Sequence, residues 1–370
     1  MRNSRLRAVS AFFSGLVCVV LASALVAPVA HAKSSNKPLA KADKIRIGFF
    51  GNVTHASALV AQQEKFFEKF FSADGTSVEY VAFSAGPAAI EAIKGGSIDV
   101  AFVGVTPAVS GYSTTKSSGG VLRIISGATV GGVQFITKPG ITKVSQLRGK
   151  NIATPQLGGT QDVALRAFLK SKGFKVNVLG GGDVTISPTD NATTLTLFKN
   201  GQIDGAWVPE PWASRLVLEG GGKVFLDESK LWAKGKFVTT QVVAQTNYLK
   251  QYPGTIKALL RALDHTNKFI RKNPAKAKND VQLQLQKWTG KTLTDAVINR
   301  AWSNITPTLD PVAHSLKANV KNLINAGLAD SYLVSNGVKG VRGIYDLRVL
   351  NSIHSSGKRG HYSAERLGLQ

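Results

Sequence analysis

The chain has 370 residues, with 46 lysines and arginines against 22 aspartates and glutamates, which gives a formal net charge of +24. The basic residues are spread thinly, without a dense run or an alternation with aromatic residues, so we exclude nucleic acid as a specific partner. The length is ample for two domains with large cores. The single cysteine, Cys18, lies near the N-terminus, so the rest of the chain has no disulfide, thiol nucleophile or thiolate-bound metal.

Residues 1–32 have the pattern of a cleavable export signal. The segment opens with three arginines: Arg2, Arg5 and Arg7. An uncharged apolar run follows over residues 11–30, and Ala30-His31-Ala32 fits a small-x-small cleavage site. The alternative is an uncleaved membrane anchor, because the run is just long enough to span a bilayer; Pro28 argues against it. We therefore expect a periplasmic or otherwise extracytoplasmic protein, in which residues 33–44 form a flexible leader.

Residues 45–130, which we call lobe one, alternate between buried-strand and helix patterns. Strands are predicted at 45–50, 78–83, 98–103 and 121–126. Helices are predicted at 56–71, with apolar residues at helical spacing, and at 87–94, which begins at a proline and stops at two glycines. Strands separated by helices at this spacing predict a parallel sheet covered on both faces.

Residues 131–232, which we call lobe two, show a second alternating series. Its predicted strands are 134–137, 151–154, 184–187, 203–208 and 224–226, and its predicted helices are 144–147, 158–172, 192–199 and 211–219. A strand at 237–244 then returns to lobe one, and the rest of 233–330 is mainly helical, at 253–271, 275–287, 293–303 and 311–327. The crossings at 128–132 and 227–238 would form a hinge. Residues 331–370 are a weakly patterned tail, with one short docking helix at 344–353 and a disordered end.

One phrase occurs twice in the chain, at residues 94–103 (KGGSIDVAFV) and 199–208 (KNGQIDGAWV). Each copy is typical of a helix end, a glycine stop and a short buried strand. The first strand runs into a predicted loop at Thr106-Pro107, and the second runs into one at residues 209–212. Ligands of open α/β sheets lie beyond the carboxyl ends of the strands. Two matching units therefore predict two similar lobes that face each other across a ligand-binding cleft.

Several motifs, taken together and in order, resemble a known family. They are Ser84-Ala85-Gly86-Pro87, Gly96-Ser97-Ile98-Asp99, Gly104-x-Thr106-Pro107, Leu147-Arg148-Gly149-Lys150 and Gly201-x-Ile203-Asp204 with Pro209-Glu210-Pro211-Trp212. This set resembles the periplasmic solute-binding proteins of ABC importers for sulfonates, taurine and nitrate, and it is most similar to the aliphatic sulfonate branch. The resemblance covers residues 44–327. It implies the two-lobe (type II) periplasmic-binding-protein fold, an α/β fold in which each lobe is a sheet flanked by helices and two hinge crossings join the lobes.

The resemblance also implies a function. Such a protein captures a small organic anion, here an alkanesulfonate-like solute, and delivers it to an ABC permease in the membrane without any chemistry of its own. We expect a monomer with no cofactor and no metal. Enclosing a permanent anion costs several kcal/mol unless donors replace its water. Helix N-termini supply free N–H groups and a partial positive charge.

The leading candidates for contact with the anion are Gly159, Thr160 and Gln161, which open a predicted helix where the resemblance places the anion. Further candidates at predicted strand ends are Asn52, Thr54, His55, Gly86 and Thr106. For each of these residues, ordinary turn, capping or surface chemistry is the alternative.

Glu210 and Trp212 would face these residues from lobe two. In relatives that bind taurine, an acidic residue in this loop pairs with the amine, and many of those relatives carry aspartate where this chain has Glu210. Glu210 either contacts an amine or hydroxyl of the ligand or holds a hinge donor in place. Trp212 either walls the aliphatic part of the ligand or packs in the core. We expect Asp99 and Asp204 to be structural, bonding turn amides after each glycine stop.

Other ligands and other classes of function remain to be weighed. Taurine, nitrate, bicarbonate and a thiamine-precursor pyrimidine are the alternative ligands; a pyrimidine calls for two aromatic faces, and the predicted loops offer one clear tryptophan. A secreted enzyme on the same fold is the alternative class. No His-x-x-x-His pair and no Gly-x-Ser-x-Gly motif occurs in the sequence. The related pyrimidine synthases use a cysteine-rich motif that this chain lacks, so we expect no catalysis.

Overall fold

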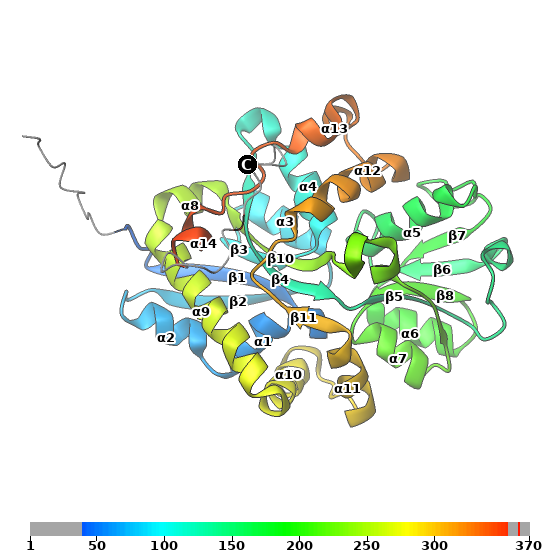
Figure 1. Cartoon of the computed structure of the whole chain (residues 1–370), viewed down its shortest axis with the longest axis horizontal. Helices are drawn as coiled ribbons and strands as arrows, with labels where there is room; N and C mark the ends of the chain where they lie inside the picture. The colour runs from blue at the N-terminus through cyan, green and yellow to red at the C-terminus, as the bar shows by residue number, and fades with distance from the viewer. Residues whose placement is uncertain (1–38, 354–361, 363–370) are drawn as a thin grey trace, which may run out of the picture. The chain divides into compact units, whose positions relative to one another are not determined.

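The computed structural model describes residues 39–353 and residue 362 (Figure 1). The predicted signal at 1–32 and half of the predicted leader lie outside these residues, as does nearly all of the C-terminal end predicted to be disordered. Residues 39–353 belong to one compact unit. None of the helices described is both long enough and apolar enough to cross a bilayer.

Lobe one is built on a six-stranded sheet with the strand order β11-β4-β10-β3-β1-β2. Its strands are β1 (Lys44–Phe50), β2 (Ser77–Phe83), β3 (Val100–Val103), β4 (Leu122–Gly131), β10 (Val238–Gln245) and β11 (Ile305–Pro307). β1 pairs in parallel with β2 and β3, whereas β10 runs antiparallel to β3 and β4. The predicted return strand is therefore confirmed, and the prediction of a parallel sheet is wrong. The sheet is mixed because β10 enters it from the end at which the chain comes back from lobe two.

Lobe two has a five-stranded sheet with the order β7-β6-β8-β5-β9. Its strands are β5 (Val133–Thr137), β6 (Asn151–Thr154), β7 (Thr185–Pro188), β8 (Gly205–Pro209) and β9 (Lys223–Asp227). β6 pairs in parallel with β7 and β8, and β5 is antiparallel to β8 and β9. This sheet is mixed for the same reason, since β5 enters it directly from lobe one (Figure 1).

The repeated phrase corresponds to a matching contact in the two sheets. A carboxylate oxygen of Asp99, just before β3, accepts a hydrogen bond from the backbone N–H of Arg46 at 2.8 Å. A carboxylate oxygen of Asp204, just before β8, accepts one from Asn151 N–H at 2.9 Å. Each aspartate thus ties its central strand to the neighbouring strand, β1 or β6. The structural role predicted for both is confirmed, with a strand amide as the partner where a turn amide was predicted.

Two crossings connect the lobes. The first joins β4 to β5 through Gly131 and Gly132, both with φ of +76°. A Cβ added at Gly131 would lie 2.7 Å from the carbonyl oxygen of Asn304, so this close approach of two backbones requires glycine. The second crossing, residues 228–237, contains two short 3-10 helices and leads from β9 to β10. Both crossings lie where the sequence predicts a hinge.

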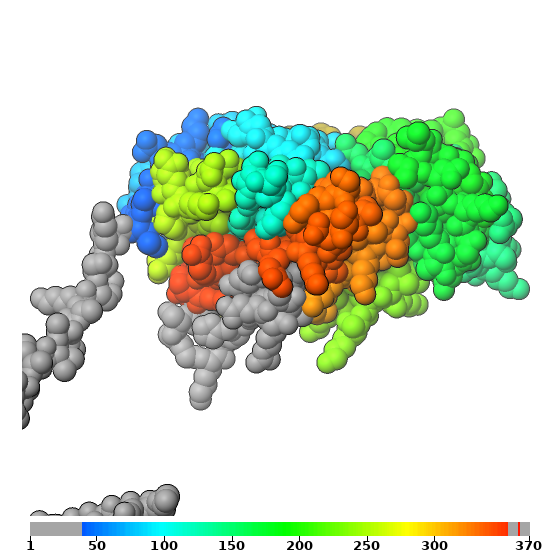
Figure 2. All heavy atoms as spheres, turned by 90° about the horizontal axis from the view of Figure 1, so that it is seen from above, coloured from blue at the N-terminus to red at the C-terminus, as the bar shows by residue number. Residues whose placement is uncertain are grey.

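Helices cover both sheets. They are α1 (Ala56–Gln63), α2 (Phe66–Ser72), α3 (Gly86–Lys94), α4 (Val105–Ser113), α5 (Thr160–Ser171), α6 (Asn191–Lys199), α7 (Trp212–Leu218), α8 (Thr246–Gln251), α9 (Pro253–Lys272), α10 (Pro274–Thr289), α11 (Asp295–Ser303), α12 (Leu316–Ala326), α13 (Ser331–Asn336) and α14 (Arg348–Ser352). α12 packs against both α4 and α5, so the returning helices contact lobe two as well as lobe one (Figure 2). The docking helix predicted at 344–353 corresponds to α14.

Two predictions about helices are wrong. The segment 56–71 is not one helix, because Lys65 adopts a left-handed conformation with φ of +53° and separates α1 from α2. This break turns α2 so that Phe66 and Phe67 are buried against the core. Thr106-Pro107 is not a loop but lies in the first turn of α4, where a proline costs no intrahelical hydrogen bond because the first N–H groups of a helix have no partner within it.

Candidate functional site

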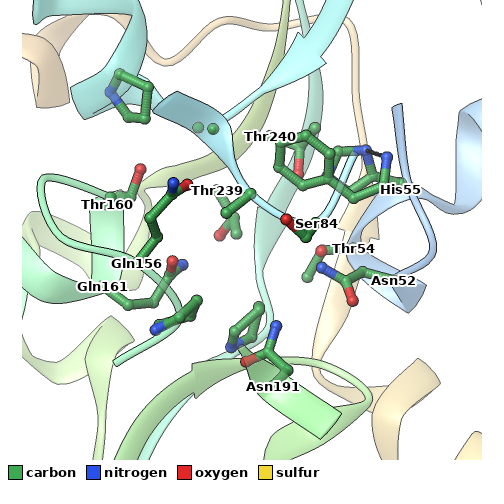
Figure 3. A pocket seen from close by; sticks show the side chains of 18 residues that line it. Asn52, Thr54, His55, Ser84, Gln156, Thr160, Gln161, Asn191, Thr239 and Thr240 are labelled. Carbon is green, nitrogen blue, oxygen red and sulfur yellow. Dashed lines mark hydrogen bonds between the residues drawn. The ribbon is translucent and has the colours of Figure 1, made fainter. Parts of the chain in front are cut away.

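A small cavity, which we call the inner cavity, lies between the two lobes. It is lined by the ends of β1 and β2 and the start of β10 from lobe one, and by the loop after β6 and the start of α6 from lobe two (Figure 3). Seven of the ten candidate residues line this cavity: Asn52, Thr54, His55, Gly86, Gly159, Thr160 and Gln161. The segments that provide them are far apart in the chain, and the fold brings them together at the edge where the parallel strands end.

The N-terminus of α5 reaches across the cavity to lobe one. Gly159 is the N-cap of α5 and its side-chain position is empty, so the first backbone N–H groups of the helix have no side-chain cap. Thr160 is buried against Gly104, where an added Cβ would lie 2.2 Å from the Thr160 hydroxyl oxygen. Gly104 therefore permits the close approach of the two lobes at this point.

A buried ion pair holds the loop before α5 in place. Asp162 accepts hydrogen bonds from the Thr154 hydroxyl, the Gly158 backbone N–H and the Arg166 guanidinium, each at 3.0 Å. Arg166 also donates to the carbonyl oxygen of Asn177 at 2.9 Å, and both charged side chains are buried. Asp162 thus positions the glycine turn that forms one wall of the cavity. This pair was not predicted, although an aspartate and an arginine four residues apart on one predicted helix are a visible signal for it.

Lobe one contributes Asn52, Thr54 and His55 to the opposite wall (Figure 3). The Nδ1 atom of His55 accepts a hydrogen bond from the Phe50 backbone N–H at 3.3 Å, and the imidazole packs on the Phe50 ring with centroids 4.4 Å apart. Burial lowers the pKa of His55 to about 3. The ring is therefore neutral at neutral pH, and its proton is on Nε2, which makes it a hydrogen-bond donor and not a cation.

The lining of this cavity contains no lysine, arginine, aspartate or glutamate among the residues that the structure describes. Its polar groups are hydroxyls, amides, the neutral imidazole and backbone N–H groups at the starts of α3 and α5. Such a lining can surround an oxyanion with neutral donors, as helix N-termini do elsewhere.

The comparisons with known proteins agree on the family. A model of the NMT1-like family matches residues 39–284. The chain belongs to this family. Over 232 residues it is 24% identical to a putative binding protein of Brucella abortus, covering 62% of this chain and 68% of that protein. It is 26% identical over 216 residues to the taurine-binding periplasmic protein of Escherichia coli, covering 58% of this chain and 63% of the relative.

The NMT1-like chain also shares its fold with solved structures. The alkanesulfonate-binding protein of Xanthomonas axonopodis, bound to MOPS, superposes with a TM-score of 0.64 at 21% identity, over 79% of this chain and 96% of that one. The periplasmic nitrate-binding protein of Synechocystis gives a TM-score of 0.66 at 17% identity, over 80% and 84% of the two chains. The predicted family and the predicted two-lobe fold are thereby confirmed.

A second and larger cavity, which we call the outer chamber, adjoins the inner cavity in this NMT1-like structure. The two chambers share Phe50, Asn52, Ser84 and Asn191 as lining residues. The outer chamber adds mainly apolar side chains: Phe83, Trp212, Leu285 and Leu293. The charged groups at its edge are Asp190, Arg215 and Lys291. Trp212 therefore lines the space next to the inner cavity rather than the inner cavity itself.

The remaining two candidates, Thr106 and Glu210, do not line either chamber. Thr106 is fully buried at the start of α4. The buried Glu210 carboxylate accepts hydrogen bonds from Arg300 at 3.2 Å, from Asn304 at 2.7 Å and from the Ser214 N–H at 3.0 Å. Burial raises the pKa of Glu210, although these donors act against that rise. Of the two roles weighed for Glu210, this geometry matches the one that holds hinge groups in place.

Several polar residues that line the inner cavity were not among the predicted site residues: Ser84, Gln156, Asn191, Thr239 and Thr240. Ser84 directly follows β2 and Gln156 is the second residue after β6, so their position at strand ends was a usable signal. Thr239 and Thr240 had no such signal, because they lie within the return strand β10. Within the described residues, no group of three or more histidine, cysteine, aspartate or glutamate side chains is arranged to hold a metal ion.

The lowered pKa of His55 predicts an effect of pH on stability. Its ordinary value of 6.5 falls to about 3 in the folded chain, so the unfolded chain binds a proton that the folded chain does not. Stability contributed by the neutral ring is present above pH 6.5 and is lost as the pH falls toward 3, by about 1.4 kcal/mol per pH unit. His55→Asn keeps an acceptor for the Phe50 N–H and does not titrate. We expect the difference in unfolding free energy between the two proteins, measured with urea, to shift against the wild type over this range; parallel pH curves would contradict the assignment.

Proposed function

We propose that this protein is the extracytoplasmic solute-binding component of an ABC importer. It captures a small organic anion, foremost an aliphatic sulfonate, between its lobes and delivers it to a membrane permease. The observation that carries this proposal is the inner cavity, in which seven candidate residues from both lobes converge and the lining is polar but uncharged. Membership of a family whose relatives are named as binding proteins supports the same reading. The protein acts as a monomer after export, and it catalyses no reaction.

The chemistry of the lining suits a permanent anion. A sulfonate has three accepting oxygens and no proton, and the cavity offers donors on both sides. Hydrogen bonds to a charged group contribute roughly 1.5–3 kcal/mol each, so five or six of them, less the cost of association, give an affinity in the micromolar range. The net charge of +24 adds a long-range attraction for anions.

The two chambers favour an organic anion with an apolar part. Nitrate and bicarbonate have no apolar part, so neither would contact the apolar side chains of the outer chamber. Taurine carries an ammonium group, but the inner cavity has no lining carboxylate and Glu210 is already held by Arg300. Asp190, which lines the outer chamber, caps α6 through the Thr193 N–H. An alkanesulfonate places its anionic head in the inner cavity and its tail against Trp212.

A flat pyrimidine is the second candidate ligand, and one observation favours it. The predicted loops offer one clear tryptophan, whereas the outer chamber is lined by three aromatic side chains, Phe50, Phe83 and Trp212. A ring between such side chains would stack well. A thermal-shift panel of alkanesulfonates, taurine, nitrate, bicarbonate and pyrimidines separates the candidates. A true ligand at a hundredfold excess over its Kd stabilises the fold by about 2.7 kcal/mol, and a panel in which no alkanesulfonate stabilises the protein contradicts the proposal.

Removal of donors at the start of α5 tests where the anion binds. The double variant Thr160→Ala/Gln161→Ala loses a hydroxyl and an amide that line the inner cavity. We expect it to bind an alkanesulfonate about 2–4 kcal/mol more weakly by calorimetry, with the fold intact by circular dichroism. The control Thr142→Ala/Gln146→Ala removes the same groups from an exposed turn outside both chambers. Equal affinities of the two double variants would count against this placement.

A further inference from the structure

Asn52 is held in one orientation by a hydrogen bond that crosses the cleft. The indole N–H of Trp212, in lobe two, donates to the side-chain oxygen of Asn52, in lobe one, at 2.9 Å. An indole N–H can only donate, so the oxygen of the amide must face it. The amide nitrogen of Asn52 is thereby left to face the inner cavity, which Asn52 lines with 6% of its surface exposed. If the amide turned over, its NH2 group would face the indole N–H of Trp212, and two donors would oppose each other.

Trp212 is itself held in place on α7. The guanidinium of Arg215 lies over its ring, 4.9 Å from the centroid, and Glu219 holds that guanidinium through both carboxylate oxygens at 3.0–3.1 Å. His55 is fixed on the same wall as Asn52, because its Nδ1 atom accepts from Phe50 and its Nε2–H remains as a donor. This wall therefore presents two N–H donors whose direction neighbouring groups determine.

The opposite wall differs in this respect. Gln156 and Asn191 also line the inner cavity, and each has a buried side-chain oxygen without a hydrogen-bond partner in the described chain. No neighbouring group fixes the direction of these two amides, so either end can turn to a ligand. The free nitrogens of Asn52 and His55 can thus only donate, whereas the amides of Gln156 and Asn191 can present either end.

We propose that Trp212 is a specificity-determining positioning residue, which fixes Asn52 as a donor so that the part of the lobe-one wall facing the Asn52 amide accepts only a ligand group that carries no proton. This inference rests on the proposed function, and it names the ligand class at that wall as a fully deprotonated oxyanion. A neutral isostere with an N–H group in the same place is rejected there, because donor would meet donor and leave buried polar groups unpaired.

The test compares two probes of nearly equal shape, methanesulfonate and methanesulfonamide, whose Kd values are measured by calorimetry. The wild type should prefer the sulfonate. In Trp212→Phe the Asn52 amide is free to turn, so the preference ratio should fall about tenfold, the value of one charge-assisted hydrogen bond at the low end of its range. In Asn52→Asp the side chain presents an oxygen to the cavity, and sulfonate affinity should fall by at least about tenfold.

Trp232→Phe is the matched control, because it removes an indole N–H that donates to Glu228, outside both chambers of the site. Its preference ratio should equal that of the wild type. A loss of packing alone would weaken both probes equally and leave the ratio of Trp212→Phe unchanged, which would overturn the inference while leaving the proposed function standing. Failure of the wild type to bind methanesulfonate or any longer alkanesulfonate would instead overturn the proposed function, and the inference with it.

Discussion

Replacing Asp162 with alanine is expected to lower the free energy of unfolding by about 3–5 kcal/mol. The substitution leaves the Arg166 guanidinium, which is 1% exposed, without its countercharge. It also removes the acceptor for the Thr154 hydroxyl and for the Gly158 N–H. Urea unfolding monitored by circular dichroism measures the loss. Because Asp162 orders the turn before α5, we also expect weaker ligand binding at temperatures where the variant remains folded.

Two control variants test whether the loss of stability comes from leaving a buried charge without its partner. The double variant Asp162→Ala/Arg166→Met removes both charges and should recover part of the lost stability, since an uncompensated buried charge costs more than the absence of the pair. Glu91, whose side chain is 70% exposed, forms an ion pair with Lys94. Glu91→Ala breaks this pair and should lower the free energy of unfolding by less than about 1 kcal/mol. A loss in Asp162→Ala no larger than that in Glu91→Ala would contradict the assigned role.

The second large effect is expected at Glu210, where alanine should lower the free energy of unfolding by about 3 kcal/mol. The carboxylate joins α11, which belongs to the returning chain, to α7 of lobe two through Arg300, Asn304 and the Ser214 N–H. Arg300 keeps its bonds to the Ser214 hydroxyl and to Gln134, both at 2.8 Å, so part of the contact survives. We therefore expect a loss in the free energy of unfolding at the low end of the range for broken buried ion pairs.

Glu210→Gln distinguishes the charge from the shape of the side chain. Glutamine keeps the volume and one acceptor oxygen, but its NH2 group must face at least one donor among the three partners. We expect it to lie between the wild type and Glu210→Ala in urea unfolding. If the alanine variant instead unfolds like the wild type and loses only ligand affinity, the carboxylate acts on the ligand and the hinge role is wrong.

Ten of the eleven strands described were predicted from the sequence, because most are short apolar runs bounded by glycine, proline or polar residues; the three-residue β11 was not predicted. The repeated phrase placed β3 and β8 at equivalent positions, and it correctly indicated two facing lobes. The mixed direction of the sheets was not predictable in this way, since an apolar run has the same pattern in either direction. The break at Lys65 was also hidden, because the apolar positions of α1 and α2 continue one helical spacing across it.

The candidate site was predictable to the extent that it is made of strand ends. Asn52, Gly86 and Thr160 lie in the segments that follow strands β1, β2 and β6, and the fold places them around one cavity. The role of Glu210 was left open because its partners, Arg300 and Asn304, are about ninety residues away and no spacing rule connects them. The outer chamber was missed for the same reason, since Leu285 and Leu293 come from the helical return segment.

The place of β10 determines the order in which the molecule can be completed. β10 lies between β3 and β4 in the six-stranded sheet, yet it comes after all five strands of lobe two in the chain. During synthesis, lobe two can assemble its sheet from one continuous stretch, β5 to β9. The sheet of lobe one lacks β10, between β3 and β4, until residue 245 has been synthesised. The connection that brings β10 to this place contains the whole of lobe two. Such long-range closure is slow compared with local pairing, so the N-terminal lobe is the later of the two to finish folding.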